Sequence, residues 1–502
     1  MSSTNAGSSI SEKLAGQEDS LDLEAMIRSD HGPIPTPTLD TPSWFFLRQL
    51  EKSSAIQKFL CYPSPGSLKI RPTSWLDGIR GVAALEVYIF HVTGCWASIV
   101  AAWHSDEDQN NILQMPVLRT LFVSGGAAVS LFFALSGYVL THKSLRWIRR
   151  RSTHRVYSAV ASSMFRRGFR LYLPPILLTF CEMLATRFGF TPPLNFSFVP
   201  EPSLSAQFMD WLAETNLLVN PVHTFQRSLQ GFVTHPKYDA VVWTIPLEFY
   251  GSFVCYTLLF MLAGIPSNSV RMGLVAVFSS SCMGMGSWNM FCFSAGMLIA
   301  DFNLSQEEYG AIPSPRPSTH GMVWTAVLAM AFYLAGFPTL AVVEAKLNPM
   351  PGFEALRLLT PMSLNMEDHS RFWWSISGVA ILLSISQLPR LKNLFETNFC
   401  QYLGKISFSL YLVHEFCIVL FGLSLQALLI NLAGLEPHAN TFMYWLTCGI
   451  WYLLFTVSVF ALAAQVERWV DVPSVRFARW LEGKCLESYR SLHQMEENRS
   501  ID

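Results

Sequence analysis

The chain has 502 residues, of which 51% are hydrophobic and 14% charged, and its formal net charge at pH 7 is −1. Soluble domains have about 25% charged residues, so this composition excludes an ordinary water-soluble protein and indicates a membrane protein. The absence of a basic excess argues against nucleic acid as a partner. The ten cysteines are scattered without a CxxC pair, so neither a metal site nor a disulfide framework is predicted.

The first 70 residues are polar and rich in Ser, Pro, Asp and Glu, and they predict a largely disordered cytosolic tail. No basic start followed by an apolar stretch marks a cleavable signal. Residues 43–60 place aromatic and aliphatic side chains among charges, as in a helix that lies on the membrane surface; a loosely ordered tail is the alternative. A second cytosolic tail is expected over residues 481–502.

Between the tails, windows of roughly 20 mainly apolar residues predict transmembrane helices. The expected fold is an all-α polytopic membrane helix bundle of about ten spans, and the windows allow a number between nine and eleven. The two short segments in the middle are the weakest, because they run together. The predicted spans are residues 79–100, 120–141, 170–187, 240–263, 271–287, 288–303, 321–343, 372–389, 406–430 and 442–466.

The distribution of Lys and Arg predicts the orientation, because such residues concentrate in cytosolic connections. Residues 142–170, 390–405 and those after 466 are rich in Lys and Arg, whereas the long connection 188–239 holds only Arg227 and Lys237. Both termini are therefore predicted to be cytosolic, in the endoplasmic reticulum or another endomembrane. The sequon at Asn195 falls on the opposite side, where it predicts a glycosylation site.

Ionisable residues inside the predicted spans are the strongest functional signal. Arg80 and His91 lie on one predicted helix eleven residues apart. That spacing leaves them only about 20° from the same direction and roughly 16 Å apart along the axis. Because a charged or polar side chain is costly in lipid, this helix face is expected to point into the bundle. Glu86 lies between them, well off the His91 direction, and could pair with another span.

Two further residues reach a similar depth. Glu248 lies eight residues after the outer start of its span, and His414 lies eight residues after the cytosolic start of its own. Both are therefore about 12 Å inside the membrane, near the expected depth of His91. Arg80, His142, Arg167 and Arg170 are instead expected at the cytosolic mouth.

This arrangement has a chemical interpretation. A neutral histidine such as His91 can accept a proton from a hydroxyl group as it attacks an acyl carbonyl, and Glu248 could orient the imidazole or share the proton. Arginines at the cytosolic mouth could bind phosphates with paired hydrogen bonds. A cytosolic acyl-CoA fits this arrangement, because its phosphates would stay at the membrane surface while its thioester reaches the proton acceptor inside the bilayer.

Five segments, in register from residue 75 to about 480, resemble the acyltransferase-3 family of integral membrane O-acyltransferases, and the single-domain fungal members in particular. They are LDGIRGVAALEVYIFH (76–91), LFFALSGYVL (131–140), FRRGFRLYLPP (165–175), WTIPLEFY (243–250) and LGKISFSLYLVHEF (403–416). Asp471-Val-Pro473 stands where the family usually has Glu-x-Pro, and Thr-Ile-Pro is a departure within the fourth motif. Residues 71–480 are thus expected to be one acyltransferase domain, with no hydrolase domain after it.

The resemblance implies an acyl-CoA-dependent O-acetyltransferase or similar enzyme without a bound cofactor, acting on a lipophilic alcohol such as a terpenoid or polyketide. The residues that we expect at its sites are, for catalysis, His91, Arg80 and Glu248; for donor binding, Arg167, Arg170, Arg149 and Arg151; and for the substrate pocket, His414, Ser136, Tyr138 and Trp243. The basic run that holds Arg149 and Arg151 could instead be only a signal of membrane topology. Ser136 and Gly137 could instead serve close helix packing.

Two other functions remain open at this stage. Intramembrane His and Glu also form proton relays in transporters, although no internal repeat relates the two halves of this chain. A non-catalytic membrane scaffold would account for the hydrophobicity but not for ionisable residues at one depth. The sequence gives no indication of oligomeric state or of the identity of the acceptor.

Overall fold

The computed structural model describes residues 62–63, 70–95, 101–103, 111–192, 198–308, 319–339, 350, 352–436 and 441–499, with side chains up to residue 487. The predicted tail, the surface helix at 43–60 and Asn195 lie outside these residues, apart from three positions of the tail. In the described part, the chain is helical throughout and contains no strand. The predicted all-α fold is therefore confirmed.

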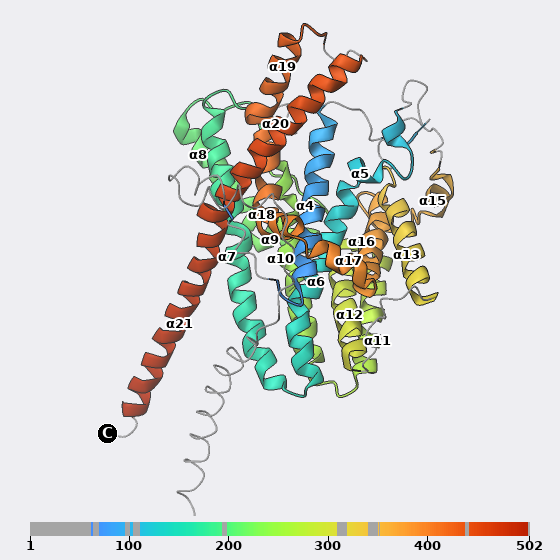
Figure 1. Ribbon diagram of the computed structural model, residues 1–502. Coiled ribbons are helices and arrows are strands. Elements are labelled where there is room, and N and C mark those ends of the chain that lie inside the picture. Colours follow the sequence, from blue (N-terminus) through green and yellow to red (C-terminus); the bar gives the residue numbers. More distant parts are fainter. Residues whose placement is uncertain are drawn as a thin grey trace, which may run out of the picture. The chain divides into compact units, whose positions relative to one another are not determined.

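The first half of the chain forms α4 (Ser74–Gly94), η2 (Ile112–Gln114), α5 (Thr120–Val123), α6 (Gly125–Arg149), α7 (Thr153–Thr186), α8 (Leu204–Val219), α9 (Pro221–Gln230), η3 (Ala240–Trp243) and α10 (Thr244–Leu262). The second half forms α11 (Asn268–Gly284), α12 (Trp288–Glu308), α13 (Thr319–Ala335), α15 (Glu354–Leu359), α16 (Ser370–Gln387), α17 (Pro389–Phe395), α18 (Asn398–Cys417), η4 (Ile418–Gly422), α19 (Leu423–Leu432), α20 (Phe442–Val466), η5 (Glu467–Asp471) and α21 (Val472–Arg499). Figure 1 shows the labelled helices in their places.

Each predicted span overlaps one or more helices in the described residues, and the uncertain pair forms the separate helices α11 and α12. By length and apolar composition alone, five of the described helices can cross a membrane, or six if the bent pair of α16 and α17 is one span. The number of spans, the orientation and the termini stay predictions. The helix α21 runs through the predicted boundary at residue 480.

The boundaries of α4 differ from the predicted span 79–100. The helix begins at Ser74, where apolar residues are interspersed with Asp77 and Arg80, and it ends at Gly94. His91 is consequently in the last turn of α4 rather than at the middle of a span. A hydropathy window places the centre of an apolar stretch, and it does not locate the ends of a helix that begins in polar sequence.

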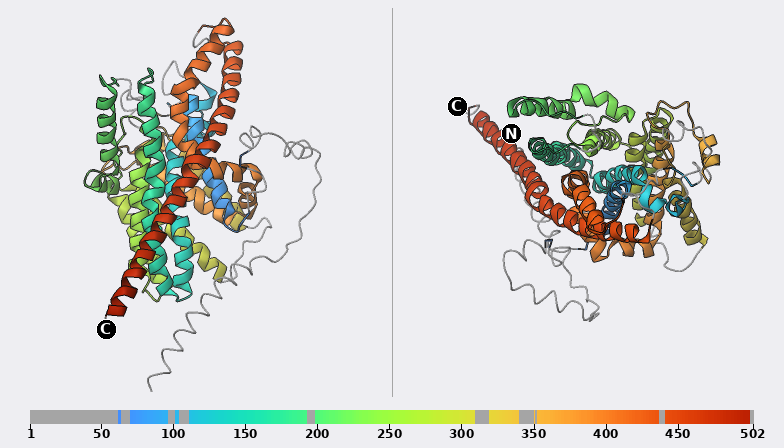
Figure 2. Two further views of the ribbon diagram at one scale, coloured as in Figure 1. Left: turned by 90° about the vertical axis from the view of Figure 1, so that its left-hand side faces the viewer. Right: turned by 90° about the horizontal axis from the view of Figure 1, so that it is seen from above.

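The contact of α4 with α18 is close because both helices carry glycine where their backbones meet. A Cβ at Gly404 would lie 2.3 Å from the carbonyl oxygen of Asp77, and one at Gly81 would lie 2.3 Å from the amide nitrogen of Gly404. Small residues allow helices to approach in this way in membranes. This contact sets α4 beside α18 along most of its length, and the views in Figure 2 also show the two helices together.

A second close contact joins α6 to α12. A Cβ at Gly137 would lie 2.0 Å from the carbonyl oxygen of Phe293, and one at Gly296 would lie 1.9 Å from that of Ala134. The packing interpretation of Gly137 is confirmed by this geometry. Because α6 also contacts α4, α10 and α16, it is the central helix around which the polar residues are arranged.

Candidate active site

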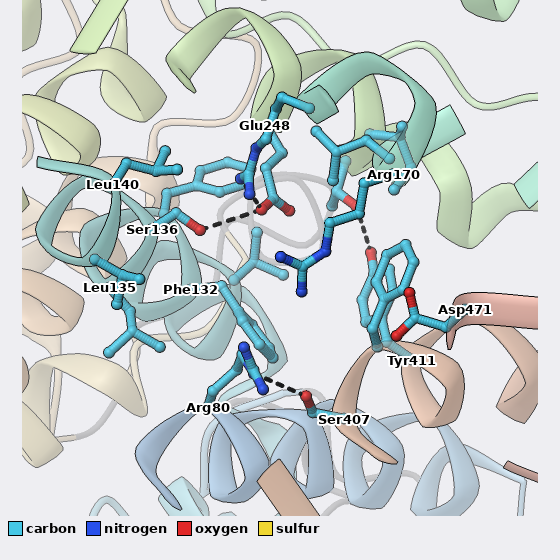
Figure 3. Close-up of a pocket in the computed structure, with 18 of the residues that line it drawn as sticks. Arg80, Phe132, Leu135, Ser136, Leu140, Arg170, Glu248, Ser407, Tyr411 and Asp471 are labelled. Carbon is cyan, nitrogen blue, oxygen red and sulfur yellow. Dashed lines mark hydrogen bonds and ion pairs between the residues drawn. The ribbon is translucent and has the colours of Figure 1, made fainter. Parts of the chain in front are cut away.

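One cavity among the described helices is lined by basic residues, and we call it the arginine cavity. It has a volume of about 180 Å³ and is lined by Arg80, Arg167, Arg170, Lys405, Glu248 and Asp471, among others. These residues come from α4, α7, α10, α18 and η5. Figure 3 shows the guanidinium groups of Arg80 and Arg170 pointing into it. The structure thus brings together three arginines that the sequence predicts at one mouth.

Arg80 is fixed by the helix that packs against α4. Its Nη2 donates to the carbonyl oxygen of Gly404 at 2.7 Å, and its Nε donates to Ser407 Oγ at 3.0 Å. An ion pair at 3.2 Å to Asp77, one turn earlier, adds a partner from α4 itself. The guanidinium is held in one orientation at the cavity wall, as a positioned binding group would be.

Glu248 lies in the arginine cavity and not beside His91. Its Oε1 accepts from Arg167 Nη2 at 2.6 Å and from Ser136 Oγ at 3.1 Å. Arg167 Nε in turn donates to Ser252 Oγ at 3.0 Å. The expectation that Glu248 orients His91 therefore finds no contact to support it, since the carboxylate instead fixes Arg167.

Lys405 is a member of this cavity that the sequence analysis assigned only to topology. It lines the cavity and its Nζ forms an ion pair with Glu467 at 2.9 Å. Asp471, from the altered Asp-Val-Pro motif, lines the same cavity. The lining has four basic side chains and two carboxylates, and Asp77 and Glu467 pair with Arg80 and Lys405 from outside it, so the charges nearly balance. A phosphate-bearing ligand would be favoured by the N–H donors gathered there and not by a net charge.

The second cavity contains His91, and we call it the histidine cavity. It has a volume of about 230 Å³ and is lined by His91, Glu415, His235, Trp243, Asp368 and Arg371, among others. The predicted pocket residue Trp243 lies here. Glu415, which directly follows His414 in YLVHEF, was not predicted as a site residue, and the adjacent histidine was the signal that could have found it.

Hydrogen bonds link His91 to His414 in a chain with one consistent direction. His414 Nδ1 lies 3.1 Å from the carbonyl oxygen of Leu410, which can only accept, so His414 carries its proton on Nδ1. Its Nε2 is then an acceptor, and it receives the Nδ1–H of His91 at 2.7 Å. The remaining nitrogen of neutral His91, Nε2, is thereby left without a proton, and Glu415 Oε1 lies 3.2 Å from it.

The same three side chains could also hold a divalent cation, since their ligand atoms all lie within 4.8 Å of one another. Two nitrogens bound to one tetrahedral zinc ion at about 2.0–2.1 Å are roughly 3.3 Å apart. The 2.7 Å between His91 and His414 is instead a hydrogen-bond distance. The geometry thus favours a proton chain.

The two cavities share a wall. Val129 of α6 and Tyr411 of α18 line both of them. The Tyr411 hydroxyl donates to the carbonyl oxygen of Val241 at 2.9 Å and lies 2.9 Å from Thr244 Oγ1, so its ring is held in place from α10 and η3. Arg80 and His91, predicted on one helix face, therefore open into different cavities on either side of this wall.

The basic run before α7 takes no part in either cavity. Arg149 is almost fully buried, and it pairs with Asp301 at 2.6 Å and with Glu308 at 2.6 Å. Asp301 also binds Arg271 through both of its oxygens. Arg151 donates to the carbonyl oxygen of Pro266. Arg149 lines a separate hollow with Arg146 and Arg150, where Glu307 and Glu308 already pair with two of these arginines. Donor binding by Arg149 and Arg151 stays a prediction.

The other predicted pocket residues lie in different places. Ser136 lines the arginine cavity, and His414 lies directly behind His91. Tyr138 lines neither cavity: it is buried, and its hydroxyl accepts from Asn303 Nδ2 at 3.2 Å. Glu86, which had no assigned role, accepts from the backbone N–H of Ser124 at 3.3 Å, at the start of α6. A carboxylate is favourable there because of the helix dipole.

The chain was compared with known families and proteins. The sequence pattern of a family described as "Acyltransferase domain" matches residues 73–463. O-acetyltransferase PaAT-1 of Phomopsis amygdali is 29% identical over 442 residues, covering 83% of this chain and 86% of that protein. Acyltransferase clz18 of Cochliobolus lunatus is 26% identical over 483 residues, covering 86% and 98%. Acyltransferase R4 of a Phoma species is 26% identical, covering 85% and 97%. No solved structure matches the chain.

Proposed function

The chain belongs to the acyltransferase-3 family of membrane acyl-transferring enzymes, and from this premise we propose that it transfers an acetyl or other short acyl group from CoA to a hydroxyl group of a lipophilic acceptor. The printed name of the Phomopsis amygdali relative, an O-acetyltransferase, favours acetyl. A terpenoid or polyketide alcohol is the first acceptor class to test. Family membership favours acyl transfer over the transporter alternative.

The observation that carries the proposal is the directed chain from Leu410 through His414 to His91. It holds His91 in the tautomer whose Nε2 has a free lone pair. General base catalysis needs such a nitrogen within reach of the attacking hydroxyl. In the proposal, the acceptor enters the histidine cavity and places its hydroxyl against Nε2.

Glu415 completes the base in this proposal. His91 Nε2 and Glu415 Oε1 lie 3.2 Å apart, a distance at which one proton can be shared between them. The pair is then either imidazolium and carboxylate or imidazole and carboxylic acid. The active form of the pair carries one proton fewer than this shared state, so that His91 is neutral and Glu415 is ionised. It gains the hydroxyl proton during attack and so reaches the shared state that the geometry fits.

The donor is assigned to the arginine cavity. Arg80, Arg167, Arg170 and Lys405 can bind the phosphates of an acyl-CoA, which Arg recognises in a bidentate manner. Glu248 holds Arg167 in the orientation for this contact. The thioester would reach the base by passing between Val129 and Tyr411, the wall that the cavities share.

The reaction balances through His91. The hydroxyl oxygen forms a bond to the thioester carbon while its proton moves to Nε2. The tetrahedral intermediate then collapses, the carbon–sulfur bond breaks, and the CoA thiolate leaves and recovers the proton from His91. The products are an ester and CoA, with no change in redox state.

The test uses membranes that contain the protein, labelled acetyl-CoA and a panel of lipophilic alcohols. His91→Ala should lower transfer by a factor of about 10²–10⁴, as expected for loss of a general base. His142→Ala is the matched control, because His142 stacks on Tyr138 and lines neither cavity. A metal chelator should leave the rate unchanged. Absence of transfer by the wild type, or equal transfer by His91→Ala, would overturn the proposal.

A further inference from the structure

Arg371, at the start of α16, lines the histidine cavity but takes no part in the base. Its guanidinium carbon lies 4.6 Å from the ring centre of Trp288, 4.8 Å from that of Trp243 and 5.5 Å from that of Trp374. Cations are attracted to indole faces at such distances. Three indoles from three separate elements thus surround one guanidinium.

Two of the three indole rings are themselves fixed by hydrogen bonds. Trp374 Nε1 donates to the carbonyl oxygen of Phe337 at 2.8 Å, and Trp288 Nε1 donates to that of Gly231 at 2.9 Å. With these N–H groups engaged, the rings keep their faces toward Arg371. The cation is therefore held in place by the protein before any ligand binds, which lowers the entropic cost of binding.

What the guanidinium lacks is a hydrogen-bond acceptor. Among the described residues, its Nη1 is buried without any partner, and no carboxylate lies within ion-pair distance. The nearby acids are used elsewhere: Asp368 Oδ1 accepts from the backbone N–H of Ser370 at 2.9 Å, and Glu367 Oε2 accepts from that of Val233 at 2.7 Å. A buried charged donor without an acceptor is costly, so a ligand oxygen would be strongly favoured there.

The charges that line the cavity decide which oxygen fits. Arg371 contributes one positive charge, and Asp368 and Glu415 are the acidic groups. When Glu415 shares its proton with His91 the cavity is close to neutral, and when Glu415 is ionised the cavity is negative. A carboxylate on the ligand would add a negative charge in either state, whereas a carbonyl oxygen accepts from Arg371 without one.

We propose that the histidine cavity binds an uncharged acceptor that carries a carbonyl oxygen in addition to the hydroxyl to be acylated, and that Arg371 donates to this carbonyl while Trp243 and Trp374 contact the apolar body. The inference rests on the proposed function only in treating the cavity's ligand as the acyl acceptor. The two oxygens then orient the acceptor between Arg371 at one end and His91 at the other.

The test measures binding directly, with purified protein in detergent and three probes built on one hydroxysteroid. The first carries a ring ketone, the second a methylene group in its place, and the third a carboxylate. A hydrogen bond from a charged donor should make the ketone bind roughly ten-fold to a hundred-fold more tightly than the methylene probe. Quenching of tryptophan fluorescence reports binding, because indoles line the cavity.

Arg371→Met should remove the preference for the ketone and leave binding of the methylene probe within about two-fold. Arg357→Met is the matched control, since Arg357 is exposed on α15 and pairs with Glu354; it should keep the full preference. Equal binding of ketone and methylene probes, binding of neither, or tighter binding of the carboxylate would overturn the inference.

His91→Ala separates this inference from the proposed function. The variant should lose acetyl transfer and yet keep the ketone preference. If the wild type binds the ketone selectively but transfers nothing to any alcohol, the carbonyl site stands and the acyl-transfer proposal fails. If transfer is observed and Arg371→Met lowers only the maximal rate, with no change in ketone preference, the carbonyl site fails.

Discussion

Replacing His414 by phenylalanine removes the acceptor of the His91 Nδ1–H while keeping a ring in the space beside it. The lost bond is 2.7 Å long, and His414 is completely buried. A buried donor left without its acceptor costs about 1–3 kcal/mol. If that cost falls on the transition state, the rate of transfer should drop by roughly 5- to 150-fold, since about 1.4 kcal/mol corresponds to a factor of ten.

The conservative variant His414→Gln should recover most of this loss. Its side-chain oxygen can accept from His91, and its NH₂ group can donate to Leu410, so both bonds of the histidine have a counterpart. If His414 had only a structural role, His414→Gln would not be more active than His414→Phe.

The assay is initial-rate transfer of labelled acetyl groups, with the concentrations of acetyl-CoA and alcohol varied separately and thermal unfolding recorded for each variant. His414→Phe should lower kcat and leave the KM for acetyl-CoA unchanged, because His414 does not line the arginine cavity. A full rate in His414→Phe, or an effect on that KM alone, would refute the tautomer argument.

Three further outcomes follow from the geometry. Val129→Phe should narrow the wall between the cavities and lower transfer of longer acyl groups more than of acetyl, measured by competition between acyl-CoAs; equal loss for all lengths would contradict it. Arg149→Met should cost about 1.5–3 kcal/mol, because Asp301 loses one charged donor but keeps Arg271, while the folded protein keeps its KM for acetyl-CoA. Gly404→Ala should lower Tm, because its Cβ would lie 2.3 Å from the Asp77 oxygen; an unchanged Tm would show that the helices can separate freely.

The sequence predicts a similar membrane depth for His91 and His414. Both positions are set by the fixed rise of a helix, and the structure brings the two rings to hydrogen-bonding distance. Depth alone could not decide which residues at one level face each other. Glu248 is predicted at a similar depth, yet it contacts Arg167, because helix packing and not composition decides which helix faces meet.

Two residues show what the sequence could not reveal. Arg149 looks like its basic neighbours in the chain, and only the approach of α12 shows that Asp301 neutralises it. Arg371 stands in a polar stretch before a span, and two of the three indoles around it, Trp243 and Trp288, come from segments far from it in the sequence. Contacts of this kind depend on long-range packing, for which a single sequence carries no local signal.

The shared wall of Val129 and Tyr411 bears on how such an enzyme can diversify. The charged residues that line the arginine cavity are distinct from Trp243, Asp368 and Arg371 of the histidine cavity. Under the proposed function, substitutions around α16 and η3 would therefore reshape the space for the alcohol without changing the residues assigned to acyl-CoA. The proposed acceptor site could then change under selection for new products without any change in the proposed donor site.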